Sequence, residues 1–120
     1  MSTETEYMER ARMLGGKKGR NSAEWDSQYW PGGGRNTDGN TVENAKYALA
    51  SLEDGVYRPH YLQEWLGRDG VEWLRDEFDM DDAEIDEFGL AIRDEFHQAW
   101  RDGYFARAEE ILLAVIGGAS

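Results

Sequence analysis

Few residues in this sequence have the spacing of a metal or catalytic site. Asp94 and His97 stand three residues apart, the spacing of half of a di-metal carboxylate site on a helix. The second half is missing, because the only other histidine is His60, beside a proline. The chain has no cysteine, which excludes thiolate ligands, disulfides and a cysteine nucleophile. We therefore expect no metal site, no cofactor and no enzymatic activity.

Two loop segments resemble ligand-binding motifs without completing them. Residues 34–41 read GRNTDGNT, with the glycines, spacing and threonine of a phosphate-binding loop, but Asn40 replaces the lysine and no predicted strand precedes the loop. An EF-hand loop beginning at Asp79 would fail at three of its required positions. Both segments are better explained as a loop followed by a helix start.

The strongest feature of the sequence is the charge of residues 64–95. This stretch holds thirteen acidic residues and three arginines, a net charge of −10, whereas the other 88 residues hold twelve acids and ten bases. We expect the stretch to be amphipathic, with an anionic outer face. Its apolar residues, continuing just beyond it, recur at helical steps of three and four: Val71, Leu74, Phe78, Ile85, Phe88, Ile92 and Phe96.

The anionic face is the predicted partner-binding site. A helix rises about 1.5 Å per residue, so ten net charges over 32 residues would give about one charge per 5 Å, against about one per 3.4 Å for a DNA strand. Such a face presents carboxylates where a nucleic-acid-binding protein expects phosphates, and salt would weaken its binding. The residues predicted to contact a basic partner are Asp76, Glu77, Asp79, Asp81, Asp82, Glu84, Asp86, Glu87, Asp94 and Glu95.

Two other interpretations of the charge stay open. An acidic surface can serve only solubility or adaptation to high salt, which the three lysines against ten arginines would also fit. Alternatively, the chain is a structural or assembly protein, for example a homodimer, that associates through exposed residues such as Trp25, Trp30 or Trp65. In every case a net charge of −12 disfavours direct binding to nucleic acid or to an anionic membrane.

The N-terminal half is expected to consist of short helices and a loop. Ser2 or Thr3 is expected to cap a loosely held helix within residues 1–20 that stops at Gly15-Gly16. Asn21, three residues before Glu24, is expected to open a short segment with Trp25 and Tyr29 on one side. Residues 30–40 form a Gly-rich loop, and Asn40 or Thr41 caps a helix that ends at Gly55, with a stripe of Val42, Ala45, Leu49 and Leu52.

The C-terminal half is expected to hold the longest helix. Short helices are predicted over about 61–67 and 69–78. Asp81 or Asp82 then caps a helix that either continues or kinks at Gly103 and ends at Gly117-Gly118. No window shows the alternation of a strand, so the sequence predicts one all-α domain over 1–120 with about five to six helices. The longest apolar run, 111–116, is too short for a bilayer, so we expect a soluble, intracellular protein without membrane contact.

Three short motifs carry a resemblance to a known group. GRNSAEW at 19–25, DGNT at 38–41 and LEDG at 52–55 resemble, in order, the pattern of small uncharacterised acidic proteins encoded by actinobacteriophages. The likeness covers about residues 10–56 and, more loosely, the final helix. Residues 26–37 look like an insertion, and Val56-Tyr57 stands where the group has an acidic residue and a proline.

That group has no established activity. The resemblance implies a phage accessory protein acting in the cytoplasm of a host bacterium. Small acidic phage proteins of this kind look like the DNA mimics that inhibit restriction enzymes, CRISPR effectors or other DNA-processing enzymes. The predicted partner is therefore a basic, nucleic-acid-binding host protein.

Overall fold

The fold, a computed structural model, is described for residues 3–37, 39–53 and 71–118. These residues contain α-helices and one short 3-10 helix, and no β-strand. The all-α prediction and the long C-terminal helix are thus confirmed. The elements are α1 (Glu4–Asp26), η1 (Ser27–Tyr29), α2 (Thr41–Glu53), α4 (Trp73–Phe78) and α5 (Asp82–Gly118).

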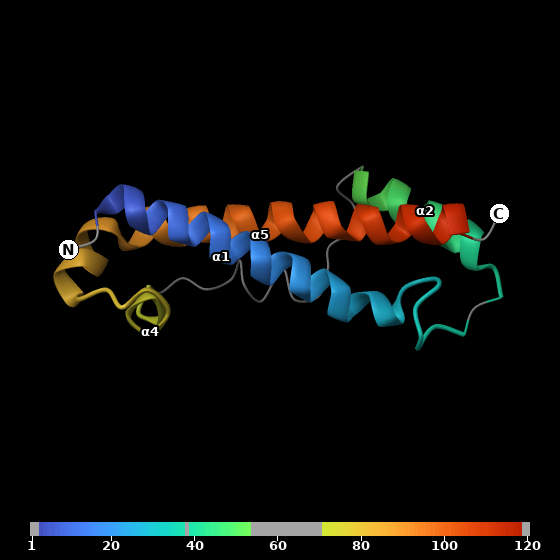
Figure 1. Ribbon diagram of the computed structural model, residues 1–120, viewed down its shortest axis with the longest axis horizontal. Coiled ribbons are helices and arrows are strands. Elements are labelled where there is room, and N and C mark those ends of the chain that lie inside the picture. The colour runs from blue at the N-terminus through green and yellow to red at the C-terminus, as the bar shows by residue number, and fades with distance from the viewer. Residues whose placement is uncertain (1–2, 38, 54–70, 119–120) are drawn as a thin grey trace.

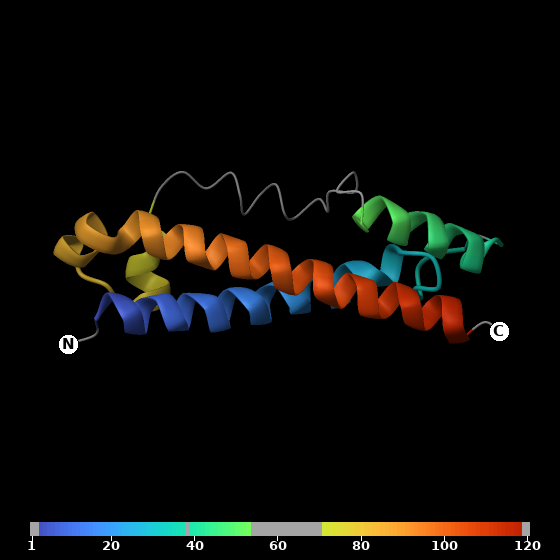
Figure 2. The same ribbon diagram turned by 90° about the horizontal axis from the view of Figure 1, so that it is seen from above.

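Helices α1 and α5 lie side by side and run in the same direction along the molecule (Figure 1 and Figure 2). Near their starts, the Tyr7 hydroxyl donates a hydrogen bond of 2.5 Å to Glu84. Near their ends, Arg107 of α5 pairs with Glu24 of α1 at 2.9 Å. The parallel pair makes an elongated molecule with extents of 54 × 24 × 21 Å.

The two long helices approach each other closely because small residues face the contact. A Cβ atom on Gly19 would lie 2.0 Å from the carbonyl oxygen of Trp100, and one on Gly103 would lie 2.4 Å from that of Gly16. Any larger side chain at these points would therefore push the backbones apart. The buried face of α1 has a small residue at every fourth position: Ala11, Gly15, Gly19 and Ala23.

The helix stop predicted at Gly15-Gly16 is consequently wrong. Each glycine in a helix interior costs about 1 kcal/mol relative to alanine, but here the loss is offset by the apolar surface that α1 buries against α5. Asn21 lies exposed within α1, so the helix start predicted there is also wrong. The predicted cap at Thr3 is confirmed, and it forms a reciprocal capping box with Glu6.

Helix α2 covers the C-terminal half of α5 and runs in the opposite direction (Figure 2). The predicted helix start at Thr41 is confirmed, and the helix ends at Glu53. Of its predicted stripe, Ala45 is buried, and Leu49 and Leu52 pack against the core while partly exposed. Residues 30–40 contain no α-helix or strand in their described part, as expected for the Gly-rich loop.

Helix α4 lies against the N-terminal half of α5. It begins at Trp73, later than the predicted start near Asp69, and ends where Asp79 adopts a left-handed conformation with φ of 56°. Asp81 then exchanges backbone and side-chain hydrogen bonds with Glu84, which confirms the predicted cap of α5. From there α5 continues through Gly103 as one helix. The helix predicted over 61–67 lies outside the described residues.

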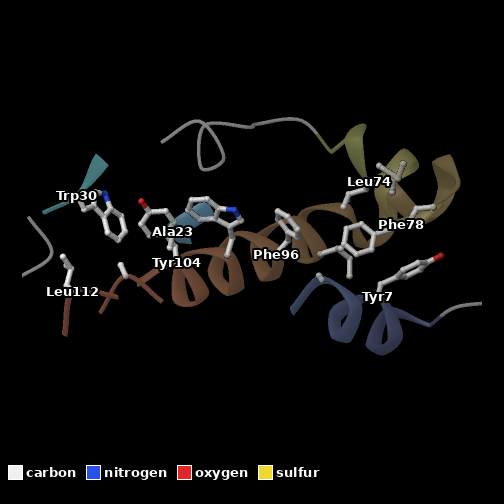
Figure 3. Close-up of a cluster of buried hydrophobic side chains, with 14 of the residues drawn as sticks. Tyr7, Ala23, Trp30, Leu74, Phe78, Phe96, Tyr104 and Leu112 are labelled. Carbon is white, nitrogen blue, oxygen red and sulfur yellow. The ribbon is translucent and has the colours of Figure 1, made fainter. Parts of the chain in front are cut away.

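Aromatic side chains follow one another through the core beside α5, from Tyr7 and Phe78 through Phe96 to Tyr104 and Trp30 (Figure 3). At one end Phe96 packs against Trp73, with ring centroids 5.0 Å apart, and edge-on against Phe78 at 6.4 Å. Further along, Tyr104 contacts Trp100 at 5.2 Å and Trp30 at 6.1 Å. These rings supply large buried areas that fix how α1, α4 and the 30–40 loop sit on α5.

Replacing Gly19 with alanine tests the close approach. Its Cβ would collide with the backbone at Trp100, and such overpacking costs about 1–3 kcal/mol, so Gly19→Ala should lower the free energy of unfolding by that amount. Gly16→Ala is the matched control, because its Cβ would meet nothing nearer than 4.0 Å and it should stabilise by up to about 1 kcal/mol. Urea unfolding measures both. Equal effects of the two substitutions would contradict the packing described.

Candidate functional site: the acidic end

The acidic residues gather at one end of the molecule, where α1, α4 and α5 begin or meet (Figure 1). We call residues 3–12 and 72–95 the acidic end; they hold fourteen acids and four arginines, a net charge of −10. The opposite end, residues 17–37, 39–53 and 96–118, holds seven acids and seven bases. The charge is therefore polarised along the long axis.

Helix α1 contributes acids that sequence reasoning did not include. Glu4, Glu6 and Glu9 join the acidic end because α1 runs parallel to α5, which brings both helix starts together. Nothing in the local sequence signals this proximity. The capping box at Thr3 predicts where α1 starts but not which helix lies beside it.

Some of these carboxylates have a structural role. Two parallel helices place their positive dipole ends side by side, and acids in the first turns of both helices counter that repulsion. The first turn of α1 contains Glu4 and Glu6, and that of α5 contains Asp82 and Glu84. The dipole effect falls off within the first turn, so it does not account for acids further along.

Four of the ten predicted binding residues form ion pairs. Because each has a nearby base, these carboxylates add little unbalanced charge to the surface. The pairs are largely exposed, so each contributes at most about 1 kcal/mol to stability. They are Glu77 with Lys18 (3.1 Å), Glu95 with Arg12 (2.8 Å), Asp94 with Arg93 (2.9 Å) and Asp82 with Arg75.

Glu84 and Asp81 are held by hydrogen bonds at the start of α5. The hydrogen bond from the Tyr7 hydroxyl, and then that from the backbone N–H of Asp81, holds the pKa of Glu84 below its usual value. Asp81 in turn accepts a hydrogen bond of 2.8 Å from the backbone N–H of Glu84. These two residues thus stabilise the helix start and the contact between α1 and α5.

The remaining four predicted residues, Asp76, Asp79, Asp86 and Glu87, are exposed. Within the part of the chain that the structure describes, their side chains make no hydrogen bond or ion pair. They come from the last turn of α4, the connecting turn and the second turn of α5. We call these four residues the free carboxylates.

The free carboxylates do not lie along one straight helix. The spacing of one charge per about 5 Å assumed a single extended helix, whereas the chain turns sharply at Asp79 between α4 and α5. The four free carboxylates instead come from two helices and the turn between them. The spacing estimated for an extended helix therefore does not apply to these residues.

Asp94 and His97 have different surroundings. Asp94 pairs with Arg93, while His97 is 8% exposed and stacks on Trp73 with ring centroids 6.4 Å apart. Among the described residues, no group of three or more histidine, aspartate or glutamate side chains could hold a metal ion.

The aromatic residues proposed for self-association are placed differently from one another. Trp30 is only 9% exposed and belongs to the core, so its prediction as an exposed contact is wrong. Its burial follows from its edge-on packing against Tyr104. Trp25 is 55% exposed, and its ring centroid lies 5.7 Å from that of Tyr29. The two rings are thus on one side, as predicted. Trp65 lies outside the described residues.

Comparisons of the chain with protein-family models, curated proteins and solved structures give no match. None of the described helices is both long enough and apolar enough to cross a membrane.

The hydrogen bond between Tyr7 and Glu84 should make stability depend on pH. A carboxyl group whose pKa is lowered in the folded state stabilises the fold above its ordinary pKa and loses this effect as the pH falls through the lowered value. Tyr7→Phe should therefore lower the Tm at about pH 7, and the difference from the wild type should shrink below about pH 4.

Calorimetry at several pH values measures this difference. Tyr47→Phe is the control, because Tyr47 is 79% exposed and the loss of its hydroxyl should change the Tm little at any pH. A Tyr7→Phe difference that is the same in acid as at neutral pH would show that the bond does not act through the ionised carboxylate.

Proposed function

We propose that this chain is an inhibitor that binds a basic, nucleic-acid-binding protein through its acidic end and occupies the groove meant for nucleic acid. The observation that carries the proposal is the set of free carboxylates, Asp76, Asp79, Asp86 and Glu87, which are exposed and unpaired within the described residues. They stand at the end that carries −10 of the −12 net charge.

The concentration of negative charge at one end favours a role in partner binding over a role in solubility alone. Repulsion between like charges destabilises a compact fold, and spreading the same charge over the whole surface would reduce it while keeping the protein soluble. Here the opposite end is nearly neutral. A partner surface rich in lysine and arginine would relieve the repulsion, and the concentrated field would speed the encounter.

The helices that carry the free carboxylates are packed firmly enough to hold them in place, as mimicry of nucleic acid requires. Asp86 and Glu87 stand on α5, which is fixed to α1 by close backbone contact, and Asp76 stands on α4, whose Leu74 and Phe78 are buried. Carboxylates on a fixed frame lose little freedom when they bind, so more of the electrostatic attraction appears as affinity.

The class of target follows from the resemblance to actinobacteriophage proteins together with the charge. A phage accessory protein that competes with DNA or RNA would act in the host cytoplasm on a defence or DNA-processing enzyme, such as a CRISPR effector or a restriction enzyme. The chain itself would neither bind nucleic acid nor catalyse a reaction.

A second candidate function is assembly with another copy of the chain. The exposed pair of Trp25 and Tyr29, at the opposite end from the free carboxylates, favours it. Association through that pair would leave the acidic ends apart and would survive high salt, whereas binding through carboxylates would not.

Charge reversal at the acidic end tests the proposed inhibition. The tagged protein is used to capture partners from host lysate at low salt, and a nucleic-acid-binding partner should be released by added DNA or by high salt. For that partner, Asp86→Lys with Glu87→Lys should weaken binding and inhibition by about tenfold or more, equivalent to about 1.4 kcal/mol.

The matched control makes the same charge change on the same helix at the other end. Asp102→Lys with Glu109→Lys reverses two exposed acids of α5 and should leave inhibition nearly unchanged. If both double variants lose binding equally, only net charge matters and mimicry by the acidic end is wrong. A partner that resists both DNA and high salt would likewise exclude it.

A further inference from the structure

A small cavity lies between η1, the following loop, α2 and the last turns of α5, away from the acidic end. Its volume is about 240 Å³. We infer that it is a binding site for an uncharged, apolar ring of about the size of indole. This site is independent of the proposed inhibition, which uses the opposite end of the molecule. The residues that line the cavity are Tyr29, Trp30, Pro31, Ala48, Leu52 and Leu112.

The chemistry of the wall selects an uncharged apolar ligand. None of the six lining residues is charged, and only the Tyr29 hydroxyl and the Trp30 indole N–H supply polar side-chain atoms. A water molecule needs two to four polar partners to be held well in such a space. An apolar ring that displaces poorly held water therefore gains affinity, whereas a charged group would lose its hydration without compensation.

The volume sets the size of the ring. An apolar cavity of about 150 Å³ can bind benzene, and this cavity is larger at about 240 Å³. A bicyclic ring such as indole fills it better than a single six-membered ring does. The two aromatic lining residues, Tyr29 and Trp30, can pack edge-on or offset against such a ring.

The walls are fixed before any ligand arrives. Trp30 is 9% exposed and Leu112 is 2% exposed, and both belong to the core. The loop after Trp30 is closed by a hydrogen bond of 2.7 Å from the Gly33 N–H to the Trp30 carbonyl. Gly32 takes a left-handed φ of 87° beside Val115, a conformation that larger residues rarely adopt.

Tyr29 is the one exposed residue among the six that line the cavity, at 50%, so the cavity reaches the surface of the molecule. The Asn36 side chain donates a hydrogen bond of 3.1 Å to the Tyr29 carbonyl, so the backbone of the rim is also held. A preformed apolar space that reaches the surface is the usual form of a site for a small ligand. Binding here should therefore need no change in the fold.

Titration with indole, followed by amide nuclear magnetic resonance spectra of the full chain, tests the site. Saturable shifts should appear at cavity residues such as Trp30, Leu52 and Leu112 with a Kd of about 0.1–1 mM, which suits a ligand of so few atoms. Purine, which has a similar size but several ring nitrogens, should bind about tenfold more weakly. Equal binding of the two rings, or no saturable shift with indole, would overturn the inference.

A pair of substitutions on α2 then localises the site. Ala48→Phe places a ring inside the cavity and should abolish the indole shifts. Ala50→Phe makes the same change at an exposed position of the same helix and should leave the Kd within about twofold. Indole that binds Ala48→Phe as well as the wild type would show that it occupies another surface, and the wild-type comparison with purine stands even if Ala48→Phe does not fold.

Discussion

The close approach of α1 and α5 is the constraint on which the rest of the structure depends. At Gly19 and Gly103 there is no room for a Cβ atom, so the two backbones nearly touch. Arg20 of α1 also pairs with Glu110 of α5 at 3.1 Å, Arg107 of α5 pairs with Glu24 of α1 at 2.9 Å, and the Tyr104 hydroxyl donates a hydrogen bond to Asp26. These contacts fix the parallel direction, which in turn decides where every charged residue of both helices lies.

The parallel direction explains why acidic residues gather at one end. It also shows which of them stabilise the helix starts and which have no structural role. Two helix starts side by side favour acids in their first turns, and Glu4, Glu6, Asp82 and Glu84 satisfy this need. Ion pairs and caps account for others. Asp86 and Glu87 lie beyond the first turn of α5 and have no such partner among the described residues. The proposed binding of a basic partner rests on carboxylates that have no such structural role, and not on the total number of acidic residues.

The sequence predicts local features well because they depend on neighbours along the chain. The Thr3 capping box, the Asp81 cap and the apolar stripe with buried Leu74, Phe78 and Ile92 follow from spacing alone. The helix stop expected at Gly15-Gly16 is wrong because glycine weakens an isolated helix, and the contact with α5 that offsets this loss cannot be seen in the local sequence. The position of the α1 acids beside α5, the burial of Trp30 and the cavity at Tyr29 could not be predicted either. All three arise from contacts between segments that are distant in the sequence.

Distances between spin labels test the parallel pairing most directly. The chain has no cysteine, so pairs can be introduced at exposed positions without background: Thr5→Cys with Ala83→Cys, and Thr5→Cys with Ala114→Cys. If α1 and α5 are parallel, the first pair should be close and the second should be separated by about 45 Å, since Ala114 stands 31 positions after Ala83 on the same helix. The reverse order of distances would mean an antiparallel pair and would contradict the acidic end, and with it the proposed function.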